Sequence, residues 1–247
     1  QGDDMAVRFK ELVEQARLAD QLGFSDLLTG MHYAGYPLSQ FQLIPFLSRI
    51  MGEVPNMRIV TGIILLSLHK PLDIAENLAT MDVMSGGKVI FGAALGYREV
   101  EFLAFGTSQK ERIQRFEENI IAIKRPPIWI GANADVAIKR AARMGDCWYV
   151  NPHNRIDTII RQTEIYKKAL DDCGKPFPKE FPGRRELFVA KTREEAMRLC
   201  KPFLAAKYKA YHEWGQDTAM PEGDNDLSLA LEELQEDRFL LGPADAI

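Results

Sequence analysis

The sequence has 247 residues, of which 46% are hydrophobic and 27% are charged, and its formal net charge is −4. This length and composition fit a globular protein with one large domain or two small ones. The negative net charge excludes a global basic field that would attract nucleic acid or anionic lipid. No apolar run approaches the roughly 20 residues that span a bilayer, so no membrane partner is expected.

The three cysteines are Cys147, Cys173 and Cys200, an odd number with no Cys-x-x-Cys spacing. This pattern argues against a disulfide framework and against a zinc site. No partner base can be named for any of the thiols, so a catalytic cysteine is not expected. The sequence therefore predicts reduced thiols in a cytoplasmic protein without a metal.

The first half of the chain alternates helical and extended patterns. Apolar residues recur at helical spacing from Val7 to Leu22, and Gly23 follows as a C-cap. Pro71 suits the first turn of a later helix. Helices are expected over residues 7–22, 40–51, 71–84 and 110–124, and strands over residues 24–29, 57–66 and 89–94. A loop containing Gly96 and Gly106 is expected before the helix at 110–124.

The second half continues the alternation. Thr192 is expected to cap a long helix, with Glu195 completing a capping box. The segment 215–226 is polar and is expected to be a loop. Strands are expected over residues 128–130, 147–150, 186–190 and 239–241, and helices over residues 134–144 and 155–173.

Alternating strands and helices are typical of parallel β/α units. Seven strands are counted and the chain opens on a helix, so we expect an α/β fold, a (β/α)8 TIM barrel whose first strand lies before Gln1. We expect one domain over residues 1–247. The helix at 110–124 would pass into a strand with almost no connection, so a segment is expected to be missing between Arg125 and Pro126.

The carboxyl ends of the strands are where a β/α barrel carries its active site. His32 follows the strand at 24–29, where an imidazole can exchange protons near neutral pH, although a structural histidine is the plainer interpretation. Gly62 interrupts the bulky strand at 57–66, which indicates a bulge or ligand approach, or else a crowded barrel layer.

Three further strand ends carry polar residues. Tyr97 and Arg98 could stack on a flat ring or hold an anion, or Arg98 could simply pair with Glu101 on a solvated loop. The run Asn133-Ala134-Asp135 opens a helix whose N–H groups could bind an anion, although Asp135 could itself serve that terminus. Asn151 could bond a ring edge, but a turn-forming Asn-Pro is slightly favoured. No phosphate-binding P-loop or dinucleotide fingerprint is present.

Taken together, these segments resemble the luciferase-like flavin-dependent monooxygenases. The resemblance covers nearly the whole chain in order. Its motifs are His69-Lys70-Pro71, Ala75-Glu76, Ala79-Thr80-Met81-Asp82, Ser85-Gly86-Gly87-Lys88, Phe91-Gly92, Gly96-Tyr97-Arg98, Glu101-Phe102-x-x-Phe105-Gly106, Arg112-x-x-Arg115-Phe116, Gly145-Asp146-x-Trp148 and Gly242-Pro243.

The resemblance implies a cofactor, reduced FMN or, in one branch of the family, the deazaflavin coenzyme F-420. It implies that the flavin ring packs on a bulge at Gly62, Ile63 and Ile64, with a non-proline cis peptide at Gly62–Ile63. Tyr97, Arg98 and Asn151 are the further expected cofactor contacts. The phosphate is expected near Asn133, Ala134 and Asp135.

The sequence departs from the luciferase pattern at two positions. Met31 stands where luciferases carry a first histidine tied to catalysis, and Leu95 stands where they place a phosphate-binding arginine. His32 is the histidine that remains, and it is expected to act in proton transfer or substrate binding at the barrel mouth. His69 is expected to be a capping or surface residue. His153 is a weaker candidate, and His212 is expected to be remote.

Three functions are weighed. The first is an FMN-dependent monooxygenase that takes reduced flavin from a separate reductase and acts on a small organic substrate. The second is a hydride transferase that uses the deazaflavin, and the third is a barrel that binds flavin without catalysis. A homodimer is expected, because the helix at 40–51 carries more apolar surface than one buried stripe needs.

Overall fold

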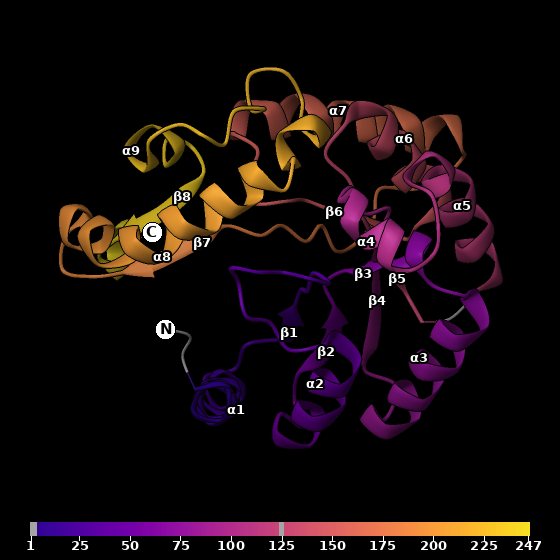
Figure 1. Cartoon of the computed structure of the whole chain (residues 1–247), viewed down its shortest axis with the longest axis horizontal. Coiled ribbons are helices and arrows are strands. Elements are labelled where there is room, and N and C mark those ends of the chain that lie inside the picture. The colour runs from indigo at the N-terminus through magenta and orange to yellow at the C-terminus, as the bar shows by residue number, and fades with distance from the viewer. Residues whose placement is uncertain (1–3, 124–125) are drawn as a thin grey trace. The chain divides into compact units, whose positions relative to one another are not determined.

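The computed structural model describes residues 4–123 and 126–247 of the chain (Figure 1). The chain divides into two compact units, Gln1–Ile130 and Gly131–Ile247. The division falls inside strand β5 (Ile128–Gly131). The junction where a missing segment is expected, at Arg125, lies outside the described residues. No helix in the described part of the chain is both long and apolar enough to cross a bilayer.

Unit 1 alternates strands and helices in the order that the sequence predicts. Its helices are α1 (Met5–Gln21), α2 (Leu43–Ile50), α3 (Pro71–Ser85), α4 (Glu99–Ala104) and α5 (Arg112–Ala122). Its strands are β1 (Asp26–Thr29), β2 (Arg58–Thr61), β3 (Ile64–Leu65), β4 (Val89–Ala94) and the start of β5.

The strands of unit 1 form a parallel sheet in the order β1-β2-β4-β5, and the short β3 pairs with the end of β4. Thr29 lies opposite Thr61, and Leu65 lies opposite Ala94. The segments that follow β1, β3 and β4 therefore leave the sheet at one edge, its carboxyl edge. This arrangement positions the candidate site.

Local sequence signals explain where these elements begin and end. Asp4 accepts a hydrogen bond from the N–H of Ala6 and so caps α1. Pro71 is the first residue of α3, and Gly86 ends that helix in the left-handed conformation that glycine adopts without steric cost. On β5, Trp129 is buried and the Arg58 guanidinium lies over its ring.

Two expectations for unit 1 need correction. The strand expected at 57–66 is divided into β2 and β3, which flank Gly62 and Ile63. The loop expected between Gly96 and Gly106 contains the helix α4. This helix is only six residues long and buries one face through Glu101 and Phe102. Too few turns are present for a helical period to stand out in the sequence.

Unit 2 continues the β/α pattern. Its helices are α6 (Asp135–Met144), α7 (Ile156–Asp172), α8 (Arg193–Glu213) and α9 (Leu231–Leu234), and its strands are β6 (Cys147–Tyr149), β7 (Glu186–Val189) and β8 (Phe239–Gly242). β7 and β8 pair in parallel, with Glu186 opposite Phe239. The segment expected to be a loop at 215–226 contains one 3₁₀ turn, Gln216–Ala219.

Helix α8 and strand β8 form much of the core of unit 2. The expected cap is present, because the Thr192 hydroxyl accepts from the N–H of Glu195. The Glu195 carboxylate accepts in turn from the N–H of Lys191, one residue earlier than the usual capping box. Trp148 on β6 is fully buried, and its indole N–H donates to the carbonyl of Ala132 at 3.0 Å.

Candidate functional site

Three glycines let the backbones come close at the carboxyl edge of unit 1. A Cβ added at Gly30 would lie 2.6 Å from the carbonyl oxygen of Gly62, and one added at Gly92 would lie 2.1 Å from that of Thr61. A Cβ at Gly62 would lie 2.3 Å from the side chain of Leu28. Neighbouring protein atoms leave no room for a side chain at these three positions. For Gly62, the geometry therefore supports the interpretation that glycine is needed in a crowded layer of the barrel.

The peptide bond between Gly62 and Ile63 is cis, as the family resemblance implies. These two residues belong to neither β2 nor β3, so the strand is interrupted there, and Gly62 donates its N–H to the carbonyl of Thr29 at 2.9 Å. Ile63 is partly buried, whereas Ile64 is buried. Ile63 is therefore the side chain of this segment that solvent or a ligand can reach.

His32 lies directly after this edge and is partly buried. Its Nδ1 is 3.1 Å from Oε1 of Glu101, and its backbone N–H donates to the side chain of Gln40 at 2.7 Å. The ring of Tyr97 meets the imidazole edge to face, with centroids 5.6 Å apart. The structure thus brings together His32 and Tyr97, two of the residues singled out in the sequence.

Met31 occupies the core rather than the site. Its side chain is buried, and its sulfur accepts a hydrogen bond from the N–H of Leu43, in the first turn of α2. The thioether therefore satisfies one of the N–H groups that a helix start leaves without a partner.

The guanidinium of Arg98 is also occupied by contacts within the protein. Its guanidinium donates to the carbonyls of Tyr33 at 2.7 Å and Ala34 at 3.1 Å, and it lies 3.6 Å from Glu101. Both Arg98 and Glu101 are buried, so the interpretation of a solvated surface pair is wrong. With its donors directed at carbonyls, Arg98 fixes the segment after β1 and is poorly placed to hold an anion.

His69 is more buried than the sequence analysis predicts. Its Nε2 is 3.3 Å from the hydroxyl of Tyr33, and both rings contact Phe105. The N-cap of α3 is Lys70, so His69 neither caps the helix nor lies on the open surface. Burial lowers the pKa of His69, and burial together with the charges of Glu101 and Asp73 raises the pKa of Tyr33 to about 12. At neutral pH the tyrosine hydroxyl and the imidazole are therefore both uncharged.

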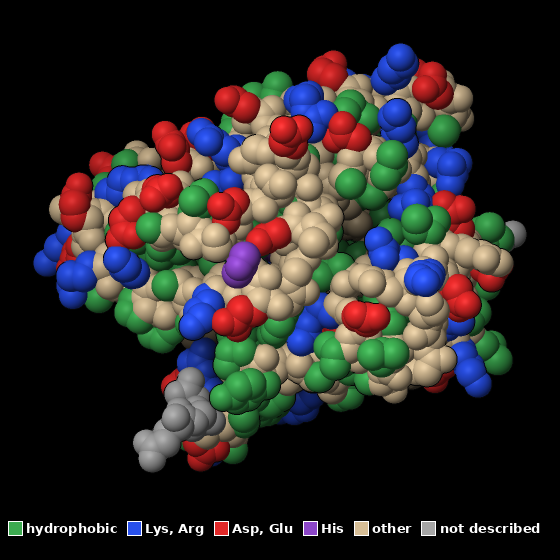
Figure 2. All heavy atoms as spheres, turned by 45° about the horizontal axis from the view of Figure 1, so that its top comes forward, with side chains coloured by type: hydrophobic (Ala, Val, Ile, Leu, Met, Phe, Trp, Pro, Cys, Tyr) green, Lys and Arg blue, Asp and Glu red, His purple; other side chains and the backbone are tan. Residues whose placement is uncertain are grey.

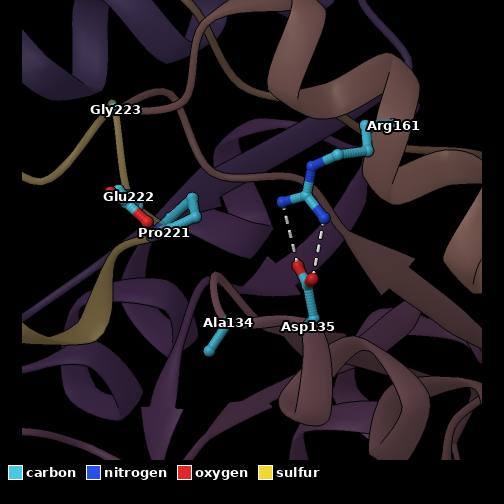
Figure 3. Close-up of a pocket in the computed structure, with 6 residues that line it drawn as sticks. All are labelled: Ala134, Asp135, Arg161, Pro221, Glu222 and Gly223. Carbon is cyan, nitrogen blue, oxygen red and sulfur yellow. Dashed lines mark hydrogen bonds and ion pairs between the residues drawn. The ribbon is translucent and has the colours of Figure 1, made fainter.

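The segment that begins α6 in unit 2 forms a separate candidate site. Asp135 is the first residue of the helix, and its carboxylate accepts two hydrogen bonds from Arg161, at 2.7 and 3.1 Å (Figure 3). Gln162 donates to the carbonyl of Asn133 at 2.6 Å. Arg161 lowers the pKa of Asp135, so the carboxylate stays charged. Asn151 also belongs here, because its amide donates to the side chain of Asn133 at 2.5 Å.

A hollow of about 540 Å³ opens at this helix start, lined by Ala134, Asp135, Arg161, Pro221, Glu222 and Gly223. Helix N–H groups and the guanidinium favour an anion there, whereas the carboxylates of Asp135 and Glu222 oppose one. Acidic and basic side chains are likewise interspersed over the molecular face in Figure 2.

The two other histidines belong to unit 2. His153 is buried, and its ring packs edge to face on Tyr208 and Tyr211. His212 is exposed on α8, where its Nδ1 lies 2.5 Å from Asp217. His153 thus has the environment of a core residue.

The roles of Glu101, Tyr33 and Arg161 were not predicted from the sequence. Glu101 belongs to a motif that carries the family resemblance, and its place beside Phe102 was the available signal. Arg161 is one of several charged residues along α7, and nothing in the sequence distinguishes it from the others.

Comparison with known proteins identifies the family. The family model described as luciferase-like monooxygenase matches residues 1–126 and, in a second stretch, residues 121–246. The chain belongs to the luciferase-like monooxygenase family. The two matched stretches overlap at residues 121–126 and together cover residues 1–246.

The curated relatives of the chain include proteins named as flavin-dependent monooxygenases. The chain is 25% identical over 182 residues to an FMNH₂-dependent dimethylsulfone monooxygenase of Pseudomonas fluorescens, covering 60% of this chain and 50% of that protein. It is 22% identical over 265 aligned positions to the oxygenase component of a flavin-dependent trigonelline monooxygenase of Acinetobacter baylyi, covering 89% of this chain and 72% of that protein. The chain spans about half the length of the first curated relatives that it matches.

Solved structures agree on the fold. A monooxygenase from Streptomyces bottropensis superposes with a TM-score of 0.80 at 22% identity, over 96% of this chain and 79% of that one. A coenzyme F-420-dependent tetrahydromethanopterin reductase from Methanopyrus kandleri superposes with a TM-score of 0.71 at 16% identity, over 96% of this chain and 84% of that one. The fold is the TIM-barrel fold of luciferase-like enzymes, built here from parallel β/α units.

Proposed function

We propose that this protein is a flavin-dependent monooxygenase that uses reduced FMN and oxygen to oxidise a small organic substrate. The observation that carries the proposal is the position of His32. It follows β1 at the carboxyl edge of the sheet, contacts the Tyr97 ring and is tied to the buried carboxylate of Glu101. The names of the dimethylsulfone and trigonelline monooxygenases support the reaction class.

The side chains at this edge fit a flat, largely apolar ring. Ile63 and Tyr97 are both partly buried and offer apolar surface, with the imidazole of His32 as a polar neighbour. We propose that the side chain of Ile63, together with the backbone of Gly62 and Ile64, forms the floor for the ring and that Tyr97 borders it. When bound, the flavin supplies the electrons that activate oxygen. The protein's residues orient the ring, exclude water and move protons.

We propose that the flavin phosphate binds at the start of α6, near Asn133, Ala134 and Asp135. The N–H groups of the helix and the guanidinium of Arg161 suit an anion. Because Arg161 already binds Asp135, a phosphate must compete with that carboxylate. Asn151 acts here by holding Asn133 rather than by facing the anion.

A comparison of FMN with riboflavin tests this assignment, because riboflavin lacks the phosphate. Arg161→Gln is expected to weaken FMN binding and to leave riboflavin binding unchanged. Lys168→Gln removes an equal charge from an exposed position on α7, the helix that carries Arg161, and is the matched control. An equal loss for both ligands would place the phosphate elsewhere.

A deazaflavin-dependent hydride transferase is the second candidate, because a fold neighbour is named as an F-420-dependent reductase. Absorbance titrations with FMN and with coenzyme F-420, each oxidised and reduced, discriminate between the two. We expect tighter binding of reduced FMN, together with oxygen uptake. Tighter binding of the deazaflavin without oxygen uptake would establish the alternative. Bound flavin without turnover would indicate the third possibility, a non-catalytic flavin-binding barrel.

A separate flavin reductase is the proposed partner, since one relative is named as an oxygenase component. We further propose that the protein works in the cytoplasm with its thiols reduced. Its three cysteines favour this location, because their number is odd and they lack Cys-x-x-Cys spacing.

A further inference from the structure

Glu101 is a buried carboxylate whose contacts are made mainly through one oxygen. Its side chain is 0% exposed. Oε1 accepts the N–H of Tyr33 at 2.9 Å, lies 3.1 Å from Nδ1 of His32 and lies 3.6 Å from Arg98. Oε2 is also buried, and the described residues provide no hydrogen-bond partner for it.

A buried carboxylate is costly unless its charge is compensated. An uncharged glutamine could accept from the N–H of Tyr33 equally well, so that contact alone does not call for a carboxylate. Among the described residues, Arg98 and the imidazole of His32 are the basic groups that pair with its negative charge. The carboxylate is therefore best explained by what it does to these neighbours.

The contact with Glu101 decides which imidazole nitrogen carries the proton. A carboxylate only accepts hydrogen bonds, so the nitrogen facing it, Nδ1, must be the donor. In the neutral ring the lone pair then lies on Nε2. Two other contacts limit how the ring turns, because the backbone of His32 is bonded to Gln40 and Tyr97 packs against the imidazole.

We propose that Glu101 is a positioning residue, which holds His32 as the Nδ1–H tautomer and stabilises the imidazolium that forms when Nε2 accepts a proton from the substrate. In that step the Nε2–H bond forms, and the bonding pair stays on the substrate atom. In the catalytic triads of hydrolases, a carboxylate likewise orients an imidazole and stabilises its protonated form, while the imidazole transfers the proton. The inference rests on the proposed function for the role of the proton, whereas the tautomer itself is a property of the protein alone.

Nitrogen-15 NMR of the protein without flavin tests the tautomer, and His32→Gln assigns the signals of this ring. In the wild type we expect a protonated Nδ1 and an unprotonated Nε2 in the neutral ring. Glu101→Leu removes the acceptor, and the Nδ1–H signal should be lost as the ring changes to the other tautomer. Glu99→Gln removes an exposed carboxylate from the same helix and should leave the spectrum unchanged.

Glu101→Gln is the second variant, and it keeps the proposal testable if the leucine variant does not fold. It retains an acceptor oxygen but not the charge, so the Nδ1 proton should remain and its signal should move upfield, as the hydrogen bond to a charged acceptor weakens. A wild-type ring protonated on Nε2, or an Nδ1 signal unchanged in both variants, would overturn the inference. Failure of the proposed function would instead appear as absent flavin binding, and it would leave these spectra as they are.

Discussion

His32 is the residue on which the proposed chemistry depends. General acid–base assistance is typically worth about 10²–10⁴-fold in rate. His32→Gln is therefore expected to lower turnover at least about tenfold while flavin affinity stays nearly unchanged. Steady-state rates and a flavin titration measure the two quantities separately. His212→Gln, on the exposed face of α8, is the control. A collapse of flavin binding with normal turnover of the bound fraction would make His32 a cofactor ligand instead.

His69 gives the stability of the protein a pH dependence. Its pKa is lowered in the folded state by burial, so folding favours the neutral imidazole. The contribution is complete above the unfolded pKa of about 6.5 and is lost as the pH falls through the folded value. Denaturant titrations between about pH 8 and pH 5 should therefore show the free energy of unfolding falling. His69→Gln should make that fall smaller, and an equal fall in both proteins would contradict the assignment.

The contact between β2 and β4 depends on a residue without a side chain. A Cβ at Gly92 would lie 2.1 Å from a backbone oxygen of β2, so Gly92→Ala must push the strands apart. We expect a loss of about 1–3 kcal/mol in the free energy of unfolding, measured by urea titration. Gly52→Ala is the matched control, because nothing lies within 4 Å of the added Cβ. Equal stabilities of the two variants would show that the sheet accommodates the methyl group.

The secondary structure elements also mark the limits of sequence analysis. Long amphipathic helices such as α3 and α7 were predicted to within a residue or two, because their period, Pro71 and their end signals are all local. The short helix α4 was missed, since its position depends on burying Glu101 against segments distant in sequence. His32 could be found from its place after a strand. The contacts of Arg98 with the carbonyls of Tyr33 and Ala34 could not be predicted, because these residues lie 65 and 64 positions away in the sequence.

At the scale of the whole molecule, we expect a homodimer. Part of the apolar surface that motivated this prediction is used within unit 1, because Phe41 and Phe46 pack on Phe9 of α1. Helix α3 nevertheless exposes Val83 at 82% and Leu72 at 70%. Light scattering should give about twice the chain mass of 27.9 kDa, and Val83→Glu should lower it. Val136→Glu, at a comparably exposed position on α6, should not. A monomeric wild type would refute the prediction.

The buried tryptophans give each compact unit its own optical probe. In unit 1, the ring of Trp129 packs against the guanidinium of Arg58. In unit 2, Trp148 is buried and its indole N–H donates a hydrogen bond to the carbonyl of Ala132. Replacing Trp214, and then one or the other of these two residues, by phenylalanine leaves a single emitter in a chosen unit. Each emitter should shift to longer wavelength when its own surroundings admit water. Coincident transitions in the two proteins would mean that the units melt together, and separated transitions would mean that one of them opens first.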